Sequence, residues 1–440
     1  MRPGPLLVLA SLGPLGCGAG AGSSPQGAPD ASTLDSPGGD GATADAASDE
    51  GAAIDSGPRG DAGDAADAAD DGPAPGCPAG TTRVQTGPSC TGGAVTTPPS
   101  WSAALQAGAR GDVISLDTAT LDAAPCLAAS ACQPAAAPAL LFSDSPEAPS
   151  ADGVLYADTV GPGAYRLYVY QVNGGASLRK FPVVILAQGA DAHVTVTRRG
   201  LAGAPSTDYV GLGKAALLGW LGSTGLPALT VPAKTRALLD PALDALHAGS
   251  QQLVHAIYDV SVDAAVKISF VSVGAGEDAA ALTGSLSLLP KDPGHDRGTF
   301  PGAERWIVAA RPLDAASVRA VRLGALPLDP PLAGVDATTG MTASLGGNYG
   351  VLYRVKVQLA TPTGLALFAR GGDWGGAAVV PPGVDGTTPT VALPAASTAL
   401  PAGPQAVVVG RFAASTSLEV QLLSAAGSSL PVDLAAAPVP

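Results

Sequence analysis

The sequence predicts an all-β protein with two tandem antiparallel β-sandwich modules of the immunoglobulin-like class, placed after a disordered N-terminal region. Three observations predict this. From about residue 138, runs of β-branched and aromatic residues alternate with turns, in a 440-residue chain that has 58 glycines and 41 prolines. Several runs return in the same order in the second half, and residues 18–76 contain hardly any large apolar side chain. An up-and-down barrel is the alternative architecture for the same runs.

Residues 1–17, MRPGPLLVLASLGPLGC, have the pattern of an export signal: one positive charge, the short apolar run LLVLASL, and small residues before Cys17. The run is far shorter than the roughly 20 apolar residues that span a bilayer. The ending PLGC resembles the lipobox of bacterial lipoproteins, although Pro14 stands where that family usually has leucine. The resemblance implies that Cys17 carries a lipid anchor and that Gly18 directs the protein to the outer membrane or cell surface. The alternative is an ordinary signal peptide and a periplasmic or extracellular protein.

Residues 18–76 form an acidic Ala/Gly/Asp segment with too few apolar side chains to offset the entropy of ordering. We expect a disordered linker. Its aspartates recur at a regular spacing, but the paired glycines of a calcium-binding repeat are missing. The segment holds most of the net charge of −14, so the remainder is close to neutral and has no basic stripe for nucleic acid.

Residues 77–137 are expected to form a small cap that is stapled by disulfides. Four cysteines lie in it: Cys77, Cys90, Cys126 and Cys132. An even number in an exported chain predicts two disulfides, for which the sequence allows three pairings. Pairing of neighbours closes two short loops and is preferred. A zinc site is the competing interpretation, but the lack of C-x-x-C and of histidine in this stretch argues against it. Trp101–Ala109 is expected to be a short helix.

The first module is placed at residues 138–290. Its expected strands are YRLYVYQV (165–172), RKFPVVILA (179–187), HVTVTR (193–198), QLVHAIYDV (252–260) and VKISFVSV (266–273). The Asn173-Gly174-Gly175 sequence between the first two predicts a hairpin, because Asn-Gly supplies the positive φ angles of a tight turn.

The second module is placed at residues 305–440, after an inter-domain loop at 291–304. YRLYV at Tyr165 is matched by YRVKV at Tyr353, and VPAKTRAL at Val231 by LPAASTAL at Leu393. The strand pair QLVHAIYDV and VKISFVSV is matched with QAVVVGRF and LEVQLLS.

Between these matched points the first copy carries an insertion, in which Ser206 or Thr207 is expected to cap a short helix that ends near Gly222. Functional residues are often found on insertions into a repeated scaffold.

Residues 140–425 also resemble a family of uncharacterised bacterial secreted or surface β-sandwich proteins. The resemblance rests on TRRGLAGAPSTDYVGLGKA (197–215), LVHAIYD (253–259), PKDPGHDRGTF (290–300) and GNYGVLYRVKV (347–357). It implies no activity, since none is assigned to that family.

Sequence motifs of catalysis are missing. The chain has four histidines but no H-E-x-x-H, and it has no G-x-S-x-G. The Gly211–Lys214 stretch fails as a phosphate-binding loop because alanine follows the lysine. We therefore assign no catalytic residue, no metal ligand and no cofactor, and we expect that the protein is not an enzyme.

Two groups of residues are candidates for binding. The insertion offers Arg198, Arg199, Asp208, Tyr209 and Lys214. These residue types suit an anionic ligand or a glycan, while the alternative is that the arginines cover a strand end and pair with local acids. The other group is His295, Asp296 and Arg297. It either supplies ligands to a metal or forms ion pairs where the two copies meet, and the second interpretation is preferred.

The favoured function is a surface lipoprotein that displays its modules for a structural or binding role toward a protein or glycan. One alternative is carbohydrate binding, which would use exposed aromatic residues such as Tyr168, Tyr170, Trp220 and Trp374. The other is a secreted enzyme that uses the His295 loop.

Overall fold

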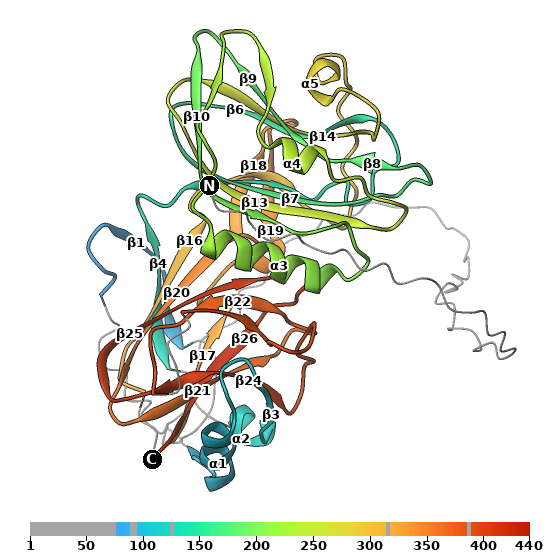
Figure 1. Ribbon diagram of the computed structural model, residues 1–440. Coiled ribbons are helices and arrows are strands. Elements are labelled where there is room, and N and C mark those ends of the chain that lie inside the picture. The colour runs from blue at the N-terminus through green and yellow to red at the C-terminus, as the bar shows by residue number, and fades with distance from the viewer. Residues whose placement is uncertain (1–75, 89–94, 124–126, 314–316, 385–388) are drawn as a thin grey trace, which may run out of the picture. The chain divides into compact units, whose positions relative to one another are not determined.

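Strands dominate the computed structural model, which describes residues 76–88, 95–123, 127–313, 317–384 and 389–440 (Figure 1). The all-β expectation is confirmed: the strands form four sheets, and these pack in pairs as β-sandwiches. Each strand order ends in two edge strands, so the sheets are open. No helix in these ranges is long and apolar enough to cross a membrane.

The first sandwich pairs an eight-stranded sheet with a five-stranded one. In hydrogen-bonded order the larger sheet consists of β11 (Leu229–Val231), β10 (Ala192–Leu201), β13 (Leu253–Val262), β7 (Gly163–Val172), β5 (Ala139–Ser143), β15 (Arg297–Phe300), β18 (Leu332–Asp336) and β19 (Met341–Leu345). The smaller sheet consists of β12 (Arg236–Leu238), β9 (Val183–Ala187), β14 (Val266–Gly274) and β6 (Gly153–Val160), with β8 (Arg179–Lys180) also paired to β14. Leu167, Val169 and Tyr258 are among the buried side chains between the two sheets.

The second sandwich pairs a seven-stranded sheet with a six-stranded one. The larger sheet consists of β1 (Thr81–Pro88), β4 (Ala128–Pro134), β16 (Glu304–Ala309), β20 (Leu352–Leu359), β25 (Ser415–Ser424), β22 (Gly376–Val379) and β23 (Thr390–Leu393). The smaller sheet consists of β2 (Val95–Thr96), β17 (Ser317–Leu323), β26 (Val432–Pro438), β21 (Thr363–Ala369), β24 (Gln405–Phe412) and β3 (Val113–Ser115). Strands from residues 77–137, expected to be a cap, thus extend both of these sheets.

The two sandwiches share the same strand order. In the first sandwich we number the strands from β6 to β14 as 1 to 8 along the chain, leaving out β8. The two sheets then have the orders 1-8-3-6 and 2-7-4-5, with β5, β15, β18 and β19 added beside strand 2. The strands β17 and β20 to β26 give the same two orders. Each sandwich adds a parallel strand at the same place: β5 beside β7, and β16 beside β20. This is the order of a jelly roll, whereas an immunoglobulin domain pairs an ABED sheet with a CFG sheet. The immunoglobulin-like class is therefore not confirmed.

Two details of the expected repeat are wrong. The runs 165–172 and 179–187 form no hairpin, because β7 pairs with β13 and β5 while β8 and β9 pair with β14 in the other sheet. Neither Asn173 nor Gly174 has a positive φ; the Asn173 side chain instead donates to the carbonyls of Ser177 and Ala248. The match of the last strands is also shifted by one strand, since β13 corresponds to β25 and β14 to β26. QAVVVGRF, which forms β24, corresponds to the three-residue β12, too short to be recognised in sequence.

The helices are short: α1 (Pro99–Ala107), α2 (Thr118–Ala123), α3 (Tyr209–Gly222), α4 (Pro241–Asp244), α5 (Ala279–Leu282) and the 3₁₀ turn η1 (Gly346–Asn348). Helix α3 confirms the predicted helix and its end at Gly222. Its cap was wrongly assigned: Asp208 Oδ1 accepts the amide hydrogen of Gly211 at 2.9 Å, while the Ser206 hydroxyl accepts that of Asp208. The α3 helix lies between the sandwiches, where it contacts β10 and β13 of the first and β22 and β23 of the second (Figure 1).

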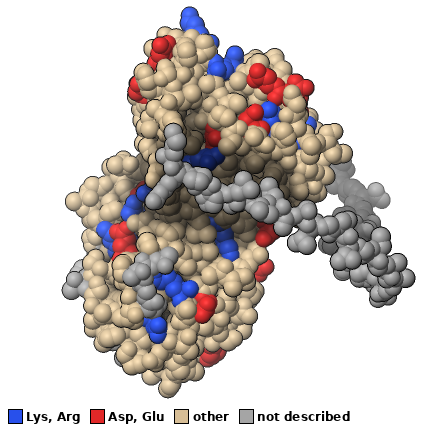
Figure 2. Space-filling model, in the orientation of Figure 1, with Lys and Arg blue, Asp and Glu red and all other residues tan. Residues whose placement is uncertain are grey.

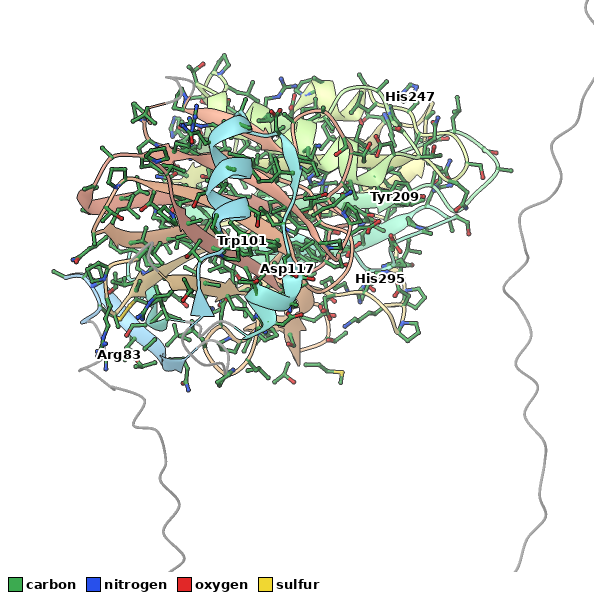
Figure 3. All side chains as sticks on the ribbon, turned by 90° about the horizontal axis from the view of Figure 1, so that it is seen from below. Arg83, Trp101, Asp117, Tyr209, His247 and His295 are labelled. Atoms are coloured by element: carbon green, nitrogen blue, oxygen red, sulfur yellow. A yellow bond between two sulfur atoms is a disulfide. The ribbon has the colours of Figure 1, made fainter. Side chains whose placement is uncertain are left out.

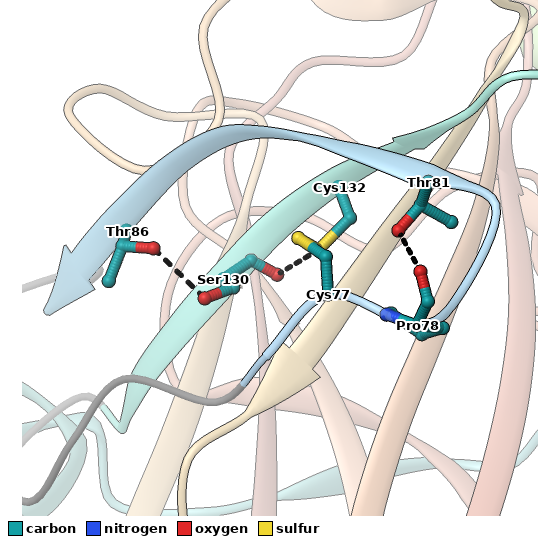
Figure 4. Close-up of a disulfide and its surroundings, with 6 residues drawn as sticks. All are labelled: Cys77, Pro78, Thr81, Thr86, Ser130 and Cys132. Atoms are coloured by element: carbon teal, nitrogen blue, oxygen red, sulfur yellow. Dashed lines mark hydrogen bonds between the residues drawn. A yellow bond between two sulfur atoms is a disulfide. The ribbon is translucent and has the colours of Figure 1, made fainter.

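The disulfide in the described residues joins Cys77 to Cys132 (Figure 4), so the preferred pairing of neighbours is wrong. The physical reason is that the β1–β4 ladder places Cys132 opposite Arg83, and the turn from Pro78 to Thr81 folds Cys77 back over that ladder. Of the three possible pairings, the one that includes this bond also joins Cys90 to Cys126. Those two cysteines lie outside the described residues, and so does Cys17.

Candidate ligand-binding pocket

A pocket of about 330 Å³ opens where loops of both sandwiches meet β7. Strand β5 and the loop after it, β7, the loop before β15, the β19–η1 segment and the turn after β25 all contribute to its wall. The lining residues are Phe142, Asp144, Glu147, Tyr168, Tyr170, Gly294, His295, Asp296, Leu345, Gly346, Tyr349, Ala426 and Gly427. The pocket is rich in carboxylates and in tyrosine rings.

Strand periodicity places the tyrosines of β7 in this wall. Side chains alternate between the two faces of a strand. Leu167 and Val169 face the core between the sheets of the first sandwich, so Tyr168 and Tyr170 face the opposite way, toward the second sandwich. Arg166 lies on the same outer face and ties the sandwiches together: it pairs with Asp259 at 2.7 Å and donates to the carbonyls of Ala303 and Gly350.

Tyr168 is 1% exposed, and its hydroxyl has no hydrogen-bond partner among the described residues. Its ring stacks on Phe142 with centroids 5.0 Å apart and packs against His255 at 4.7 Å. Burial, with smaller contributions from Tyr349 and Asp144, raises the pKa of Tyr168 well above its usual value. Burial likewise raises the pKa of Tyr349, to about 12. Both phenols therefore stay protonated and uncharged at neutral pH.

Asp144 has a buried Oδ1 atom with no hydrogen-bond partner among the described residues. Burial, followed by the charges of Glu147, Asp292 and Asp296, raises the pKa of the Asp144 carboxyl well above its ordinary value. Asp144 is half-buried, and the Oδ1 atom of its ionised form would lack both solvent and an ion-pair partner among the described residues. The site therefore favours either a proton on Asp144 or a cation beside it.

His295 is held between two carboxylates. Its Nδ1 atom lies 2.8 Å from Asp292 Oδ1, and its Nε2 atom lies 2.8 Å from Glu147 Oε2. Asp292 also accepts hydrogen bonds from the backbone amides of Glu147, Gly294 and His295. Burial acts to raise the pKa of Asp292, but these hydrogen bonds outweigh it and leave the pKa lowered. Asp292 thus remains ionised and fixes the His295 loop in place.

The residues expected to bind on the insertion do not converge. The Arg198 guanidinium lies 4.7 Å from the Trp220 ring, and Arg199 pairs with Asp240 at 2.7 Å. Asp208 caps α3. Lys214 Nζ donates to the carbonyls of Pro394 and Ser397, at 2.8 and 2.6 Å, and so joins α3 to the second sandwich.

Tyr209, the remaining candidate of the insertion, lies just behind the pocket. Its ring meets Tyr170 edge to face at 6.4 Å, and its hydroxyl donates to the Gln251 carbonyl. Figure 3 labels both Tyr209 and His295. The insertion therefore supports the pocket wall without lining it.

The second group of expected residues is divided. His295 and Asp296 line the pocket, and Asp296 also pairs with Lys291 at 3.0 Å. Arg297 is buried: it pairs with Asp336 at 3.0 Å and donates to the Leu155 and Leu289 carbonyls. Within the described ranges, no group of three or more His, Cys, Asp or Glu residues is arranged to hold a metal ion.

The aromatic residues expected to be exposed are buried: Tyr168, Tyr170, Trp220 and Trp374. Only the two tyrosines reach the pocket. Sequence reasoning missed Asp144 and Glu147, although Asp-Ser-Pro-Glu directly after a strand was a visible polar signal. It also missed Tyr349, which a later loop brings to the same wall and whose hydroxyl donates to the Ser428 carbonyl.

The sequence matches no protein-family model, and no curated protein matches it. Among solved structures, similarity is found to the PBSX exported protein XepA, at 12% identity over 65% of this chain and 86% of that chain, with a TM-score of 0.13. Hazelnut (Corylus avellana) vicilin is 9% identical over 68% and 86%, with a TM-score of 0.12. Bacillus subtilis oxalate decarboxylase is 12% identical over 68% and 77%, with a TM-score of 0.10. These TM-scores are too low to carry an argument about fold or function.

Proposed function

We propose that this protein is an exported, membrane-anchored binding protein whose ligand enters the pocket beside β7. The observation that carries the proposal is the pair of buried, unpartnered polar atoms in the pocket wall, Asp144 Oδ1 and the Tyr168 hydroxyl. Leaving a buried polar group unpaired costs about 1–3 kcal/mol. Both atoms are closed to solvent, so a ligand recovers this free energy when Asp144 or Tyr168 turns toward the pocket and pairs with it.

We further propose that the chain carries two tandem copies of one sandwich module. Support comes from the shared strand order and from the parallel strand that each sandwich adds at the same place. The copies differ in their insertions, with α3 in the first and the β18–β19 hairpin in the second. The β18–β19 hairpin ends at the pocket wall, at Leu345 and Gly346.

Pocket blocking tests the binding role. Gly346 lines the pocket, has no atom within 4 Å of an added Cβ and has no positive φ, so Gly346→Trp adds an indole at the pocket wall without backbone strain. Gly276→Trp is the matched control, because Gly276 has equal space on a loop after β14. We would titrate both variants and the wild type with butylamine, acetate and methyl glucoside by calorimetry. The proposal requires that at least one compound binds and that only Gly346→Trp abolishes its binding.

The membrane anchor rests on the lipobox-like ending at Cys17, which lies outside the described residues. A lipoprotein carries two or three acyl chains, and each buried methylene adds about 0.8 kcal/mol. The expected result is that the wild type stays with membranes through a carbonate wash and that Cys17→Ser releases it. A Cys17→Ser protein that remains fully in the membrane fraction would refute the anchor.

Carbohydrate binding remains a second candidate, because sugar hydroxyls can donate to Asp144 and a sugar face can pack on the half-buried Tyr349 ring. Binding of methyl glucoside that Gly346→Trp abolishes would favour it.

A further inference from the structure

We propose that the pocket recognises a primary ammonium group on an alkyl chain. This inference rests on the proposed binding function and names its ligand class. It follows from three features of the described residues: the excess of carboxylates, the two unpartnered oxygen atoms and the surrounding aromatic rings.

The charges around the pocket are unbalanced. Asp144, Glu147 and Asp296 line it, and Asp292 lies behind His295. The nearby groups that can be positive are His295, whose two ring nitrogens already contact Asp292 and Glu147, and Lys291, which pairs with Asp296. Four carboxyls thus face two basic groups. An anionic ligand is repelled, and a cation is attracted.

The two unpartnered oxygen atoms, Asp144 Oδ1 and the Tyr168 hydroxyl oxygen, favour a ligand that has hydrogen-bond donors. Asp144 Oδ1 accepts only, when ionised, and the Tyr168 oxygen accepts while its hydrogen stays free to donate. A primary ammonium presents three N–H donors, enough for both oxygen atoms. A charge-assisted hydrogen bond to Asp144 is about twice as strong as a neutral one. A quaternary ammonium has the charge but lacks these donors.

The aromatic wall accommodates the remainder of the ligand. Tyr168 and Tyr170 lie next to each other on one face of β7, and Tyr349 and Phe142 also line the pocket. Ring faces attract cations, and they also bury methylene groups. The lining therefore suits an ammonium head followed by an apolar stem.

The same chemistry has three sources: a free alkylamine, a lysine side chain of a partner protein and the headgroup of phosphatidylethanolamine. Butylamine tests the shared chemistry. Nα-acetyl-lysine amide and vesicles of phosphatidylethanolamine, with phosphatidylcholine vesicles as their control, then separate the sources.

The deciding experiment is calorimetric titration of the full chain at pH 7.5 and low salt. We expect butylamine to bind at least tenfold more tightly than butan-1-ol, its neutral counterpart, and choline to bind more weakly than butylamine. Asp144→Asn, which keeps shape and removes charge, is expected to weaken butylamine at least tenfold. Glu277→Gln makes the same change of charge at an exposed residue outside the pocket and is expected to leave the affinity unchanged. Thermal melts establish that each variant is folded.

Equal affinity for butylamine and butan-1-ol, or an unchanged affinity in Asp144→Asn, would overturn the inference. If methyl glucoside or acetate binds and Gly346→Trp abolishes that binding, while butylamine does not bind, the ligand class is wrong and the binding function stands. If none of the three compounds binds, both proposals fail.

Discussion

Protonation of His255 is expected to destabilise the fold at mildly acidic pH. The side chain is fully buried on β13, where Nδ1 contacts the Val169 carbonyl at 2.7 Å and the rings of Tyr168 and Tyr170 cover it. Burial lowers the pKa of His255 from 6.5 to about 4, although the Val169 hydrogen bond acts in the opposite direction. Because the unfolded chain takes up this proton more readily, stability is complete above pH 6.5 and is lost as pH falls toward 4.

The size of the effect follows from the two pKa values. Between pH 7.5 and pH 5, a histidine that titrates near 6.5 when unfolded and near 4 when folded removes about 2 kcal/mol of folding free energy. We would measure urea unfolding at both pH values for the wild type and for His255→Gln, which keeps a donor for Val169 but cannot titrate. The difference between the two proteins isolates His255 from other titrating groups. Parallel pH dependences, or a His255 NMR resonance that titrates near pH 6.5, would refute the reasoning.

Three further predictions concern other parts of the fold. Because the pKa of Asp144 is raised in the folded protein, its protonated carboxyl stabilises the fold below pH 3.8, and this stabilisation is lost as pH rises through the folded-state pKa. Unliganded Asp144→Asn should therefore melt at a higher temperature than the wild type at pH 7.5, with little difference at pH 3.5. The Cys77–Cys132 bond joins residues 55 apart, and its loss should lower the free energy of unfolding by about 4 kcal/mol in the chain-entropy model. An unchanged urea midpoint in Cys77→Ser would contradict this. Lys214→Met leaves two carbonyls without their donor and should cost roughly 1–3 kcal/mol in the same assay, whereas wild-type stability would mean that α3 needs no such link.

Runs of β-branched and aromatic residues predicted the long strands well. The runs at 165–172, 252–260 and 266–273 all form strands, because strands of nine or ten residues carry a clear pattern. Sheet membership could not be predicted in the same way. Partners such as β4 and β16 lie far apart in the sequence, and two- or three-residue strands such as β2 and β12 leave no pattern.

The pocket was predicted only in part for the same reason. His295 and Asp296 stood out because polar residues cluster around them, but the other residues that line the pocket come from distant segments. Tyr168 was expected to be an exposed aromatic residue that binds a ligand. Its ring is buried, and its hydroxyl has no hydrogen-bond partner among the described residues. The basic residues of the insertion serve structural contacts instead. Figure 2 shows Lys and Arg side chains interspersed with Asp and Glu on the face drawn.

The most direct test of the ligand class is a crystal structure of the protein with butylamine. We expect the amine nitrogen within hydrogen-bond distance of both Asp144 Oδ1 and the Tyr168 hydroxyl, with the alkyl chain against the tyrosine rings. Butylamine bound elsewhere, or bound here with its nitrogen turned away from Asp144, would contradict the account.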